Sequence, residues 1–425
     1  MIAAVRRLTL THWIFIGMGS GILLGWLAPA AAVELKPLST MFLRMIKSVV
    51  VPIIFGTLVM GIAGHGDDLK RIGRLALKSM LYFWAMTAIA LAVGLIAVHL
   101  TRPGVGVVLP PPDPHTPLPA PAPTTFSGFL EHIVPRSFFE AATNNEVLQV
   151  VFWATLFGIA LSQVRGRPKE AMLGFCEGLM EVMFRFVAIV MKFAPVGIGA
   201  AMAVTVSHSG IAVLKNLGLL VATLYGALIV FALVALVPVL LLARIPIRRF
   251  VRSVKDPAII AFTTTSSDAA LPLAMERMIE FGVPRRIVAF VMPTGYSFNL
   301  DGSTLYLGVA SIFVAQAAGV ELSLGQQLAM MLTLLITSKG IAAVPRASLV
   351  VLSGVLTTYG LPLEGVAVIL GVDELMDMAR TMINLVGNCL ATAVMGRWEG
   401  ELKPGAEPVP AMAGARALAS ERAGP

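Results

Sequence analysis

Residues 263–272 read Thr-Thr-Thr-Ser-Ser-Asp-Ala-Ala-Leu-Pro and lie in the middle of the stretch between Arg252 and Arg285. Side chains of Ser, Thr and Asp compete with the helix backbone for hydrogen bonds, so a continuous helix is not expected across this run. Both flanks are basic, and clusters of Lys and Arg mark the cytoplasmic side of a membrane protein. A segment that starts and ends on one side predicts two half-helices meeting at a polar tip, a re-entrant hairpin over about residues 250–284.

A second segment has the same pattern with the opposite flanks. Residues 337–346 read Thr-Ser-Lys-Gly-Ile-Ala-Ala-Val-Pro-Arg, and the stretch around them lies between Glu321 and Glu364 with no basic flank. We therefore predict a second hairpin over about residues 322–360 that enters from the other side. A hairpin followed by a long apolar helix, repeated with opposite orientation, is the inverted-repeat layout of secondary transporters.

The composition supports a membrane protein. Of the 425 residues, 57% are apolar and 13% are charged, whereas a soluble domain has about 25% charged residues. Such a chain cannot cover a water-exposed surface, which excludes an ordinary soluble globule and indicates a polytopic helical membrane protein. Cys176 and Cys389 both lie in apolar stretches, so neither a disulfide framework nor a Cys-based metal site is expected. No Gly-Lys dipeptide occurs, which excludes a P-loop ATPase.

The net charge of +8 comes from short basic clusters between apolar runs, so we interpret it as an orientation signal rather than a nucleic-acid surface. These clusters alternate with connections poor in Lys and Arg, which places the N-terminus in the cytoplasm. The first run ends in three alanines and also resembles a cleavable signal peptide, but the many further spans favour a retained helix. The apolar runs cover about residues 13–32, 39–63, 80–100, 146–163, 170–207, 212–243, 286–317 and 363–396.

The last apolar run carries a polar stripe. At about 100° per residue its members fall on one helix face within an arc of about 100°. Arg380 can bind a carboxylate through two parallel hydrogen bonds, and Asp377 one turn away can bind an ammonium group, which suits a zwitterionic ligand. We expect both groups to stay available until a ligand docks between the two tips; the alternative is a structural pair at i, i+3 spacing. The stripe consists of Asp373, Asp377, Arg380, Thr381, Asn384 and Asn388.

The run before the second hairpin is interrupted. Residues 293–303 read Pro-Thr-Gly-Tyr-Ser-Phe-Asn-Leu-Asp-Gly-Ser. Polar and Gly residues at mid-depth indicate unwound backbone whose carbonyls can coordinate a cation. Asp301 would be a carboxylate inside the membrane, which is costly unless it is paired, protonated or bound to an ion. The alternative is a flexible kink with a hydrogen-bonded Asp.

Four motifs, in this order, resemble the dicarboxylate/amino acid:cation symporter family, the glutamate transporter homologues. They are Ser-Ser-Asp-Ala-Ala-Leu-Pro at 266–272, Asn-Leu-Asp-Gly-Ser at 299–303, Ser-Lys-Gly and Val-Pro within 338–345, and Asp-Met-Ala-Arg-Thr with a following Asn at 377–384. The resemblance covers about residues 8 to 400 and is nearest to the bacterial proton/glutamate-aspartate branch.

The resemblance implies an all-α polytopic fold with eight transmembrane helices plus two oppositely oriented re-entrant hairpins. It also implies a homotrimer in the bacterial inner membrane, with both termini cytoplasmic, in which a transport domain moves against a scaffold and the second hairpin is the gate. The expected division is 1–79 for scaffold helices 1 and 2, 80–100 for helix 3 of the transport domain, 101–211 for the external Pro-rich loop and scaffold helices 4 and 5, 212–397 for the rest of the transport domain, and 398–425 for a disordered cytoplasmic tail.

Roles carry over by matching positions. Arg380 should bind the side-chain carboxylate of the substrate and Asp377 its α-amino group. The rest of the substrate site should be Thr381, Asn384, Ser266, Ser267, Val344 and Pro345, and the coupling-ion or proton group should be Asp301, Asn299, Asp373, Asp268, Asn388, Thr87 and Ser303. No organic cofactor, resident metal or nucleic-acid partner is expected; the partners are a small acidic amino acid and membrane lipid.

The branch within the family depends on a few positions. The C4-dicarboxylate branch lacks an acid at the position of Asp377, and the neutral amino-acid branch lacks the Arg, so a chain with both resembles an acidic amino-acid carrier. Sodium-coupled members have Asp where this chain has Asn388, and many have Ser where it has Asp268. Fewer fixed anions weaken a sodium site, while a titratable carboxylate can carry a proton. Proton coupling is therefore expected, with sodium coupling or C4-dicarboxylate symport as alternatives.

Two other classes of protein fit less well. The Gly-His-Gly-Asp tetrad at 64–67 resembles an intramembrane aspartyl protease motif but follows the end of a span, beside a basic loop, where its acid would lie in water. A channel would lack strict coupling to one substrate. We therefore expect a transporter and not an enzyme.

Overall fold

The computed structural model describes residues 10–63, 69–109, 134–143, 147–338 and 347–402. Within these ranges the chain forms helices joined by turns and short links, with no β-strand, as expected from the apolar composition. The helices are α2 (Leu10–Leu27), α3 (Pro29–Val33), α4 (Lys36–Ser48), α5 (Val50–Ala63), α6 (Leu69–Thr101), α8 (Phe138–Thr143), α9 (Val147–Gln163), α10 (Arg167–Met191), α11 (Ala194–Ser209), α12 (Val213–Phe231), the π-helical η1 (Ala232–Leu236), α13 (Val237–Leu242), α14 (Ile247–Thr264), α15 (Ser267–Glu280), α16 (Arg285–Phe298), α17 (Asp301–Ala317), α18 (Leu324–Thr337), α19 (Ala347–Thr358), α20 (Glu364–Leu370) and α21 (Asp373–Trp398).

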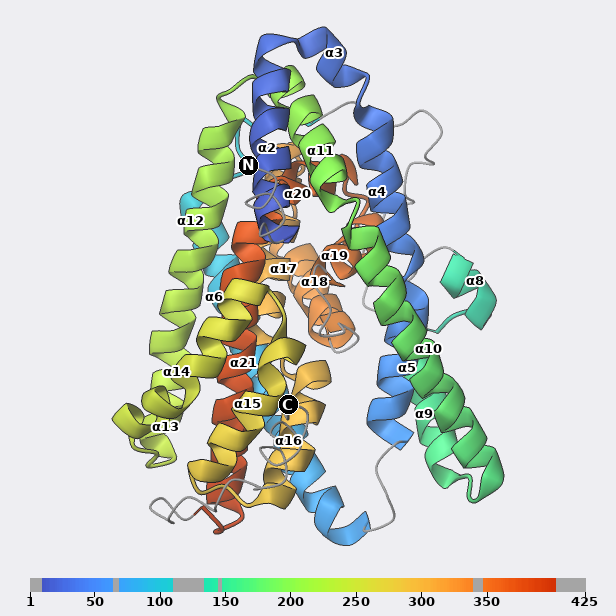
Figure 1. The fold of residues 1–425 in the computed structure, drawn as a ribbon, viewed down its shortest axis with the longest axis vertical. Coiled ribbons are helices and arrows are strands. Elements are labelled where there is room, and N and C mark those ends of the chain that lie inside the picture. Colours follow the sequence, from blue (N-terminus) through green and yellow to red (C-terminus); the bar gives the residue numbers. More distant parts are fainter. Residues whose placement is uncertain (1–9, 64–68, 110–133, 144–146, 339–346, 403–425) are drawn as a thin grey trace, which may run out of the picture.

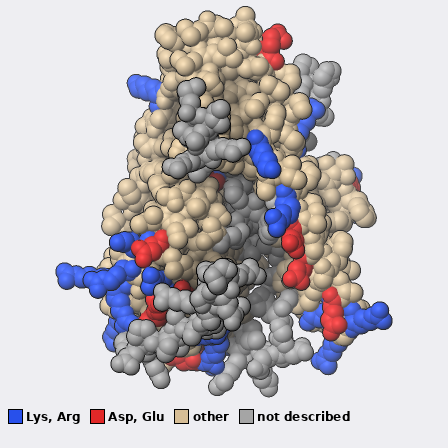
Figure 2. Space-filling model, in the orientation of Figure 1, with Lys and Arg blue, Asp and Glu red and all other residues tan. Residues whose placement is uncertain are grey.

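The helices form two groups. In Figure 1, α6, α12 and α14 to α17 surround α21, while α5, α8, α9 and α10 lie together on the right. Within the first group α17 packs against α6 and α21, and within the second α5 packs against α9 and α10. One continuous hydrophobic core joins the two groups. Lys and Arg side chains on the face shown in Figure 2 gather toward the lower end, where the loop between α13 and α14 lies. The exposed basic residues of that region include Arg244, Arg248, Arg252 and Lys255.

The described residues contain three helices that are long and apolar enough to cross a membrane, over 74–101, 213–242 and 285–317, and up to four if a bent pair counts as one span. The chain is therefore a helical membrane protein. The bent pair is α10 and α11, which differ in direction by 53°. The sequence predicts one apolar run over 170–207 and gives no break in it. The break has a local cause, because Pro195 near the start of α11 has no N–H to continue the hydrogen-bond ladder of α10. The count of eight spans stays a prediction.

The first predicted hairpin has the expected helix–turn–helix form. Helices α14 and α15 pack against each other and meet at Thr265 and Ser266. Thr265 has the left-handed φ of 51°, which is unfavourable for a β-branched residue and marks a tight reversal. The Ser266 hydroxyl accepts a hydrogen bond from the backbone N–H of Ala269 at 3.3 Å and so caps α15.

The second predicted hairpin is described in part. Its arms are α18 and α19, which also contact each other. Helix α18 begins with a capping box in which Ser323 and Gln326 exchange side-chain-to-backbone hydrogen bonds. The tip over 339–346 lies outside the described residues, so its form stays a prediction.

The predicted break in the helix after the first hairpin is present. Helix α16 ends at Phe298, α17 begins at Asp301, and the two residues between them are non-helical, with φ −128° and ψ 65° at Asn299 and φ −102° and ψ 63° at Leu300. The carbonyl end of α16 and the amino end of α17 therefore face the same region, where α21 crosses both helices.

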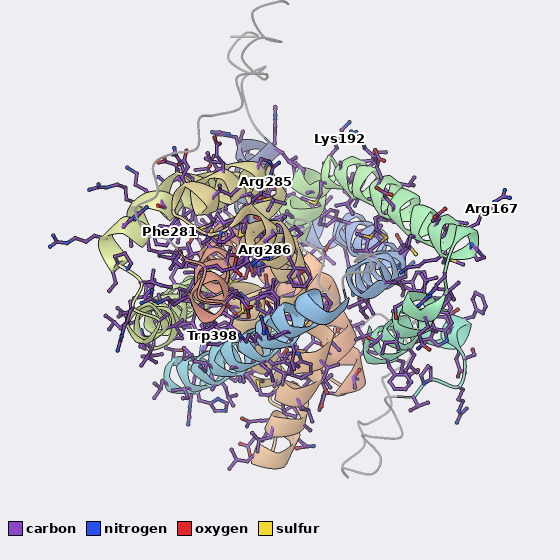
Figure 3. The ribbon with its side chains drawn as sticks, turned by 90° about the horizontal axis from the view of Figure 1, so that it is seen from below. Arg167, Lys192, Phe281, Arg285, Arg286 and Trp398 are labelled. Carbon is purple, nitrogen blue, oxygen red and sulfur yellow. The ribbon has the colours of Figure 1, made fainter. Side chains whose placement is uncertain are left out.

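Ion pairs tie α6, α16 and α21 together at the lower end. Glu399, directly after α21, pairs with Arg74 at 2.9 Å and Lys78 at 2.7 Å, both from α6. Arg286 of α16 pairs with Glu401, and Figure 3 shows Arg286 and Trp398 near the middle of this end while Arg167 lies at its edge. Hydrogen bonds from Lys78 and then Arg74 lower the pKa of the Glu399 carboxyl below its ordinary value.

Candidate functional site

The polar stripe of α21 lies inside the protein and not toward lipid. The side chains of its six members are buried, and Arg380, Asp373 and Asn388 have no exposed surface. A guanidinium this deeply buried has to be balanced by charge and hydrogen bonds, because the desolvation of an unpaired charge costs several kcal/mol. The neighbours of Arg380 show how this is achieved.

Arg380 is held from three directions. Its Nε donates a hydrogen bond to Asp377 Oδ1 at 2.9 Å. Its Nη1 and Nη2 donate to the two carboxylate oxygens of Asp373, at 2.8 and 3.4 Å. The ring of Tyr306 from α17 lies against the guanidinium, with Arg380 Cζ 4.2 Å from the ring centroid, a distance at which the ring quadrupole attracts a cation. Thr381 Oγ1 donates to the same Asp377 oxygen at 3.1 Å.

This pairing differs from our expectation that Arg380 and Asp377 stay available. The expectation omitted Asp373, which is two turns from Arg380 on the same face of α21 and reaches its guanidinium with both oxygens. The physical reason is the cost of a bare buried charge. A ligand carboxylate can reach the guanidinium only if it replaces or shares one of these contacts.

Asn384 of the stripe joins α21 to the break between α16 and α17. Asn384 Oδ1 accepts hydrogen bonds from the backbone N–H groups of Gly302 at 2.8 Å and Ser303 at 3.2 Å, and Asn384 Nδ2 donates to Ser303 Oγ at 2.9 Å. These are N–H groups of the first turn of α17, which have no partner within the helix. Gly302 is required here because a Cβ would collide with the backbone carbonyl of Arg380.

A second group of amides lies further along α21. Asn299 Nδ2 donates to Asn388 Oδ1 at 3.2 Å, and both side chains are fully buried. Asp301 is also fully buried. Its carboxylate lies beside Gly387 of α21, directly before Asn388, because a Cβ added to Gly387 would be 2.8 Å from Asp301 Oδ2. Oxygen ligands and a buried carboxylate are what a small hard cation or a proton requires. Within the described ranges no group of three or more His, Cys, Asp or Glu could hold a metal ion.

The two predicted groups of site residues are therefore partly joined. Ser303, assigned to the coupling group, contacts Asn384 of the substrate group. Asp373, also assigned to the coupling group, lies with Arg380. Thr87 on α6 is buried and donates a hydrogen bond to the carbonyl of Phe83 at 2.6 Å.

The tips are described to different extents. The backbone carbonyl of Ser267 accepts a hydrogen bond from Tyr296 Oη at 3.1 Å, which attaches the first tip to α16 one turn before the break. Ser266 serves as the helix cap, so its hydroxyl has a structural partner. The side chain of Asp268 and the residues Val344 and Pro345 lie outside the described part of the chain.

The arrangement is a buried set of one guanidinium, carboxylates and amides at the crossing of a broken helix and α21. The model of the sodium:dicarboxylate symporter family matches residues 10–398. The chain belongs to this family. Its helical architecture and its apolar composition agree with a membrane symporter.

Relatives of this symporter carry two kinds of name. A proton/sodium-glutamate symport protein of Geobacillus stearothermophilus is 41% identical over 406 residues, which is 93% of this chain and 96% of the relative. The protein of the same name in Bacillus subtilis is 41% identical over 403 residues, 92% and 93% of the two chains. A C4-dicarboxylate transport protein of Anaeromyxobacter sp. strain K is 40% identical over 397 residues, 92% and 89%. Because these identities are nearly equal, overall similarity does not decide the substrate.

Sequence reasoning missed Tyr306 in this symporter. It is a buried tyrosine of α17, five residues after Asp301, and its ring lies against the Arg380 guanidinium. The available signal was the phenol itself, because a buried Tyr usually has a polar or cationic neighbour. The neighbour could not be identified from sequence, because α17 and α21 are separated in the chain by α18 and α19 of the second hairpin and by α20.

Proposed function

We propose that this symporter imports acidic amino acids, L-glutamate and L-aspartate, across the bacterial inner membrane together with protons. The observation that supports this most directly is the Arg380 cluster: a buried guanidinium whose N–H groups already bind carboxylate oxygens, beside a second acid, Asp377, one turn away. This combination matches a ligand with a side-chain carboxylate and an ammonium group.

Each group of the site has a task in this proposal. The N–H groups of Arg380 that donate to Asp373 would donate instead to the side-chain carboxylate of the substrate. The ring of Tyr306 would hold the guanidinium in its orientation during this exchange. Asp377 receives the ammonium group, with the hydroxyl of Thr381 beside it. Asn384 offers its amide between these groups and the start of α17. Ser266 and Ser267 of the first tip, and Val344 and Pro345 of the second, close over the substrate.

Charge balance supplies the reason for coupling. Asp301, Asp373 and Asp377 against Arg380 leave these four buried side chains with two excess negative charges when all are ionised. A zwitterion with an extra carboxylate adds one more. Buried charge without compensation is costly, so binding of the substrate requires protons or cations to enter with it. Protonation of Asp373 would also free the guanidinium contacts that the substrate needs.

The amide pair of Asn299 and Asn388 favours protons over sodium as the coupling ion. Asn388 places a neutral amide beside Asn299, where a carboxylate would strengthen a sodium site. Asp373, Asp301 and Asp268 are the proposed proton carriers, and Thr87, Asn299 and Ser303 are the positions that would serve sodium if it binds. The names of the relatives from Geobacillus stearothermophilus and Bacillus subtilis include both ions.

The proposed movement is an elevator-type exchange of the site between the two sides of the membrane. The moving body would contain residues 80–100 of α6 and residues 212–397, and the static scaffold would contain residues 1–79 and 101–211. The second hairpin would be the gate, and the assembly a homotrimer. Both termini would be cytoplasmic.

The test is transport by the purified protein in liposomes, with proton and sodium gradients imposed separately. Uptake of labelled L-aspartate driven by a pH gradient in sodium-free buffer is the expected result. Strict sodium dependence would support the sodium-coupled alternative. Uptake of labelled succinate that L-aspartate does not inhibit would support the C4-dicarboxylate alternative, which the guanidinium of Arg380 and the relative from Anaeromyxobacter make the second candidate.

A further inference from the structure

A groove outside the transport site lies between α6 and α12. It has a volume of about 350 Å³ and an almost wholly apolar lining. Val93, Ile96 and Leu100 of α6 form one wall, and Leu219, Gly226 and Val230 of α12 form the other. Leu100, Ile96 and Val230 are 79%, 61% and 46% exposed, so the groove opens to the outside of the protein and not toward its core.

The surroundings of this groove are membrane. Helix α6 over 74–101 and the helix that starts with α12, over 213–242, are two of the three described helices that are long and apolar enough to span a bilayer. In Figure 1 the two helices run along the same side of the molecule, with α12 in front of α6. An open apolar groove on this surface faces lipid hydrocarbon, and acyl chains are the apolar groups available to fill it.

The groove has a fixed polar end. Thr223 Oγ1 donates to Thr101 Oγ1 at 2.8 Å and so joins the two walls. About two turns before Thr223, Asn216 Nδ2 donates to the carbonyl oxygens of Pro103 and Val105, each at 2.9 Å. These bonds hold the start of α12 against the chain that follows α6, so the mouth of the groove has a defined shape.

Two cations lie at this same end. Arg102 directly follows the last residue of α6, and Lys215 is four residues before Leu219, on the stripe of α12 that lines the groove. Both side chains are exposed, and neither has an ion-pair partner within the described ranges. Cations at the edge of an apolar transmembrane surface attract anionic lipid head groups.

The geometry points to a binding site for one anionic phospholipid, with an acyl chain in the groove between α6 and α12 and its phosphate at Arg102 and Lys215. The charge pattern selects an anionic lipid over a zwitterionic one, because two cations at the mouth repel the ammonium of a choline head group. The site lies at the end of the molecule opposite the basic loop between α13 and α14, hence in the outer leaflet by the positive-inside rule.

Glycines of α12 provide a sharp test. A Cβ at Gly226 or at Gly218 would meet nothing within 4 Å, so a side chain can leave the backbone at either position without collision. Gly226 lines the groove and Gly218 does not. Gly226→Leu should therefore fill the groove, while Gly218→Leu adds the same side chain to the same helix elsewhere. Ala222→Leu is a second filling variant, because Ala222 also lines the groove.

The experiment is native mass spectrometry of the delipidated full-length protein, titrated with dioleoyl-phosphatidylglycerol or dioleoyl-phosphatidylcholine. Wild type and Gly218→Leu should bind the anionic lipid with equal affinity. Gly226→Leu and Ala222→Leu should weaken its binding at least about tenfold, a loss of about 1.4 kcal/mol. Arg102→Gln combined with Lys215→Gln should remove the preference for the anionic lipid while leaving the binding of phosphatidylcholine unchanged.

Thermal unfolding without lipid checks that each variant is folded before it is titrated. The proposal is overturned if folded Gly226→Leu and Ala222→Leu both bind phosphatidylglycerol as wild type does. It is equally overturned if the double Arg102 and Lys215 variant keeps the full preference for the anionic lipid. Transport activity is not a readout here, so failure of the proposed function would leave this result unaffected.

Discussion

Removal of the guanidinium is the most direct perturbation of the site. Arg380→Ala takes away a fully buried cation that donates to Asp373 at 2.8 and 3.4 Å and to Asp377 at 2.9 Å. A charge-assisted hydrogen bond contributes about 1.5–3 kcal/mol. Loss of two such bonds to a substrate carboxylate corresponds to about 3–6 kcal/mol, or about 10² to 10⁴ in affinity.

The same substitution leaves two carboxylates without their partner. Removal of one member of a buried ion pair costs about 3–5 kcal/mol of stability, so the single variant should also unfold at a lower temperature. The double variant Arg380→Ala with Asp373→Asn removes one of the stranded charges and should recover part of this loss. It should not recover binding of aspartate.

The assay is calorimetric binding of L-aspartate and L-serine to purified protein, after size-exclusion chromatography and thermal unfolding have established folding. Arg277→Ala is the matched control, because Arg277 is a partly exposed cation on α15 that pairs with Glu280 at 2.8 Å. The control should bind aspartate as wild type does. If a folded Arg380→Ala variant, single or double, binds aspartate within about threefold of wild type, the assignment of Arg380 to the substrate carboxylate is wrong.

Four further outcomes are expected. Asp377→Asn keeps the shape of the side chain but removes the counter-charge for an ammonium group, so the ratio of aspartate to succinate uptake should fall at least about tenfold; an unchanged ratio in competition assays would contradict the role of Asp377. Gly302→Ala forces a Cβ against the carbonyl of Arg380, so overpacking should cost about 1–3 kcal/mol and lower the unfolding temperature; a variant as stable as wild type would show that the helices can separate. The folded-state pKa of Glu399 is lowered, chiefly by Lys78, so the stabilisation from its ion pairs is present above the ordinary pKa of Glu and is lost as the pH falls through the lowered value. At neutral pH Glu399→Gln should therefore unfold at a lower temperature than wild type, with a loss of stability of no more than about 1 kcal/mol because the partners are part-exposed. This difference should vanish in acid, and a difference that persists there would have another cause. Asn388→Asp places a carboxylate beside Asn299 and should make the rate of aspartate uptake increase with sodium concentration. An uptake rate that does not change with sodium concentration would argue against a cation site at this position.

The local elements could be predicted from sequence because their causes are local. The reversal at Thr265 and Ser266 follows from a run of Ser and Thr that competes with helix hydrogen bonds, and the structure confirms it. The non-helical residues at Asn299 were predicted from the polar residues at mid-depth, and they are present. The break between α10 and α11 was missed, although Pro195 was a visible signal within an apolar run.

By itself, the sequence determined that the chain is a helical membrane protein, where its first polar tip lies, and which face of α21 is polar, since hydrophobicity and helical period act over short distances. Only the tertiary structure decided how that polar face is used. Tyr306 of α17 and Asn299 of the break before it reach α21 from a distant part of the chain, and the pairing of Arg380 with Asp373 follows from burial where these segments cross. Burial removes water as a partner, so each charge must find another group, and which groups are near depends on the packing of distant segments.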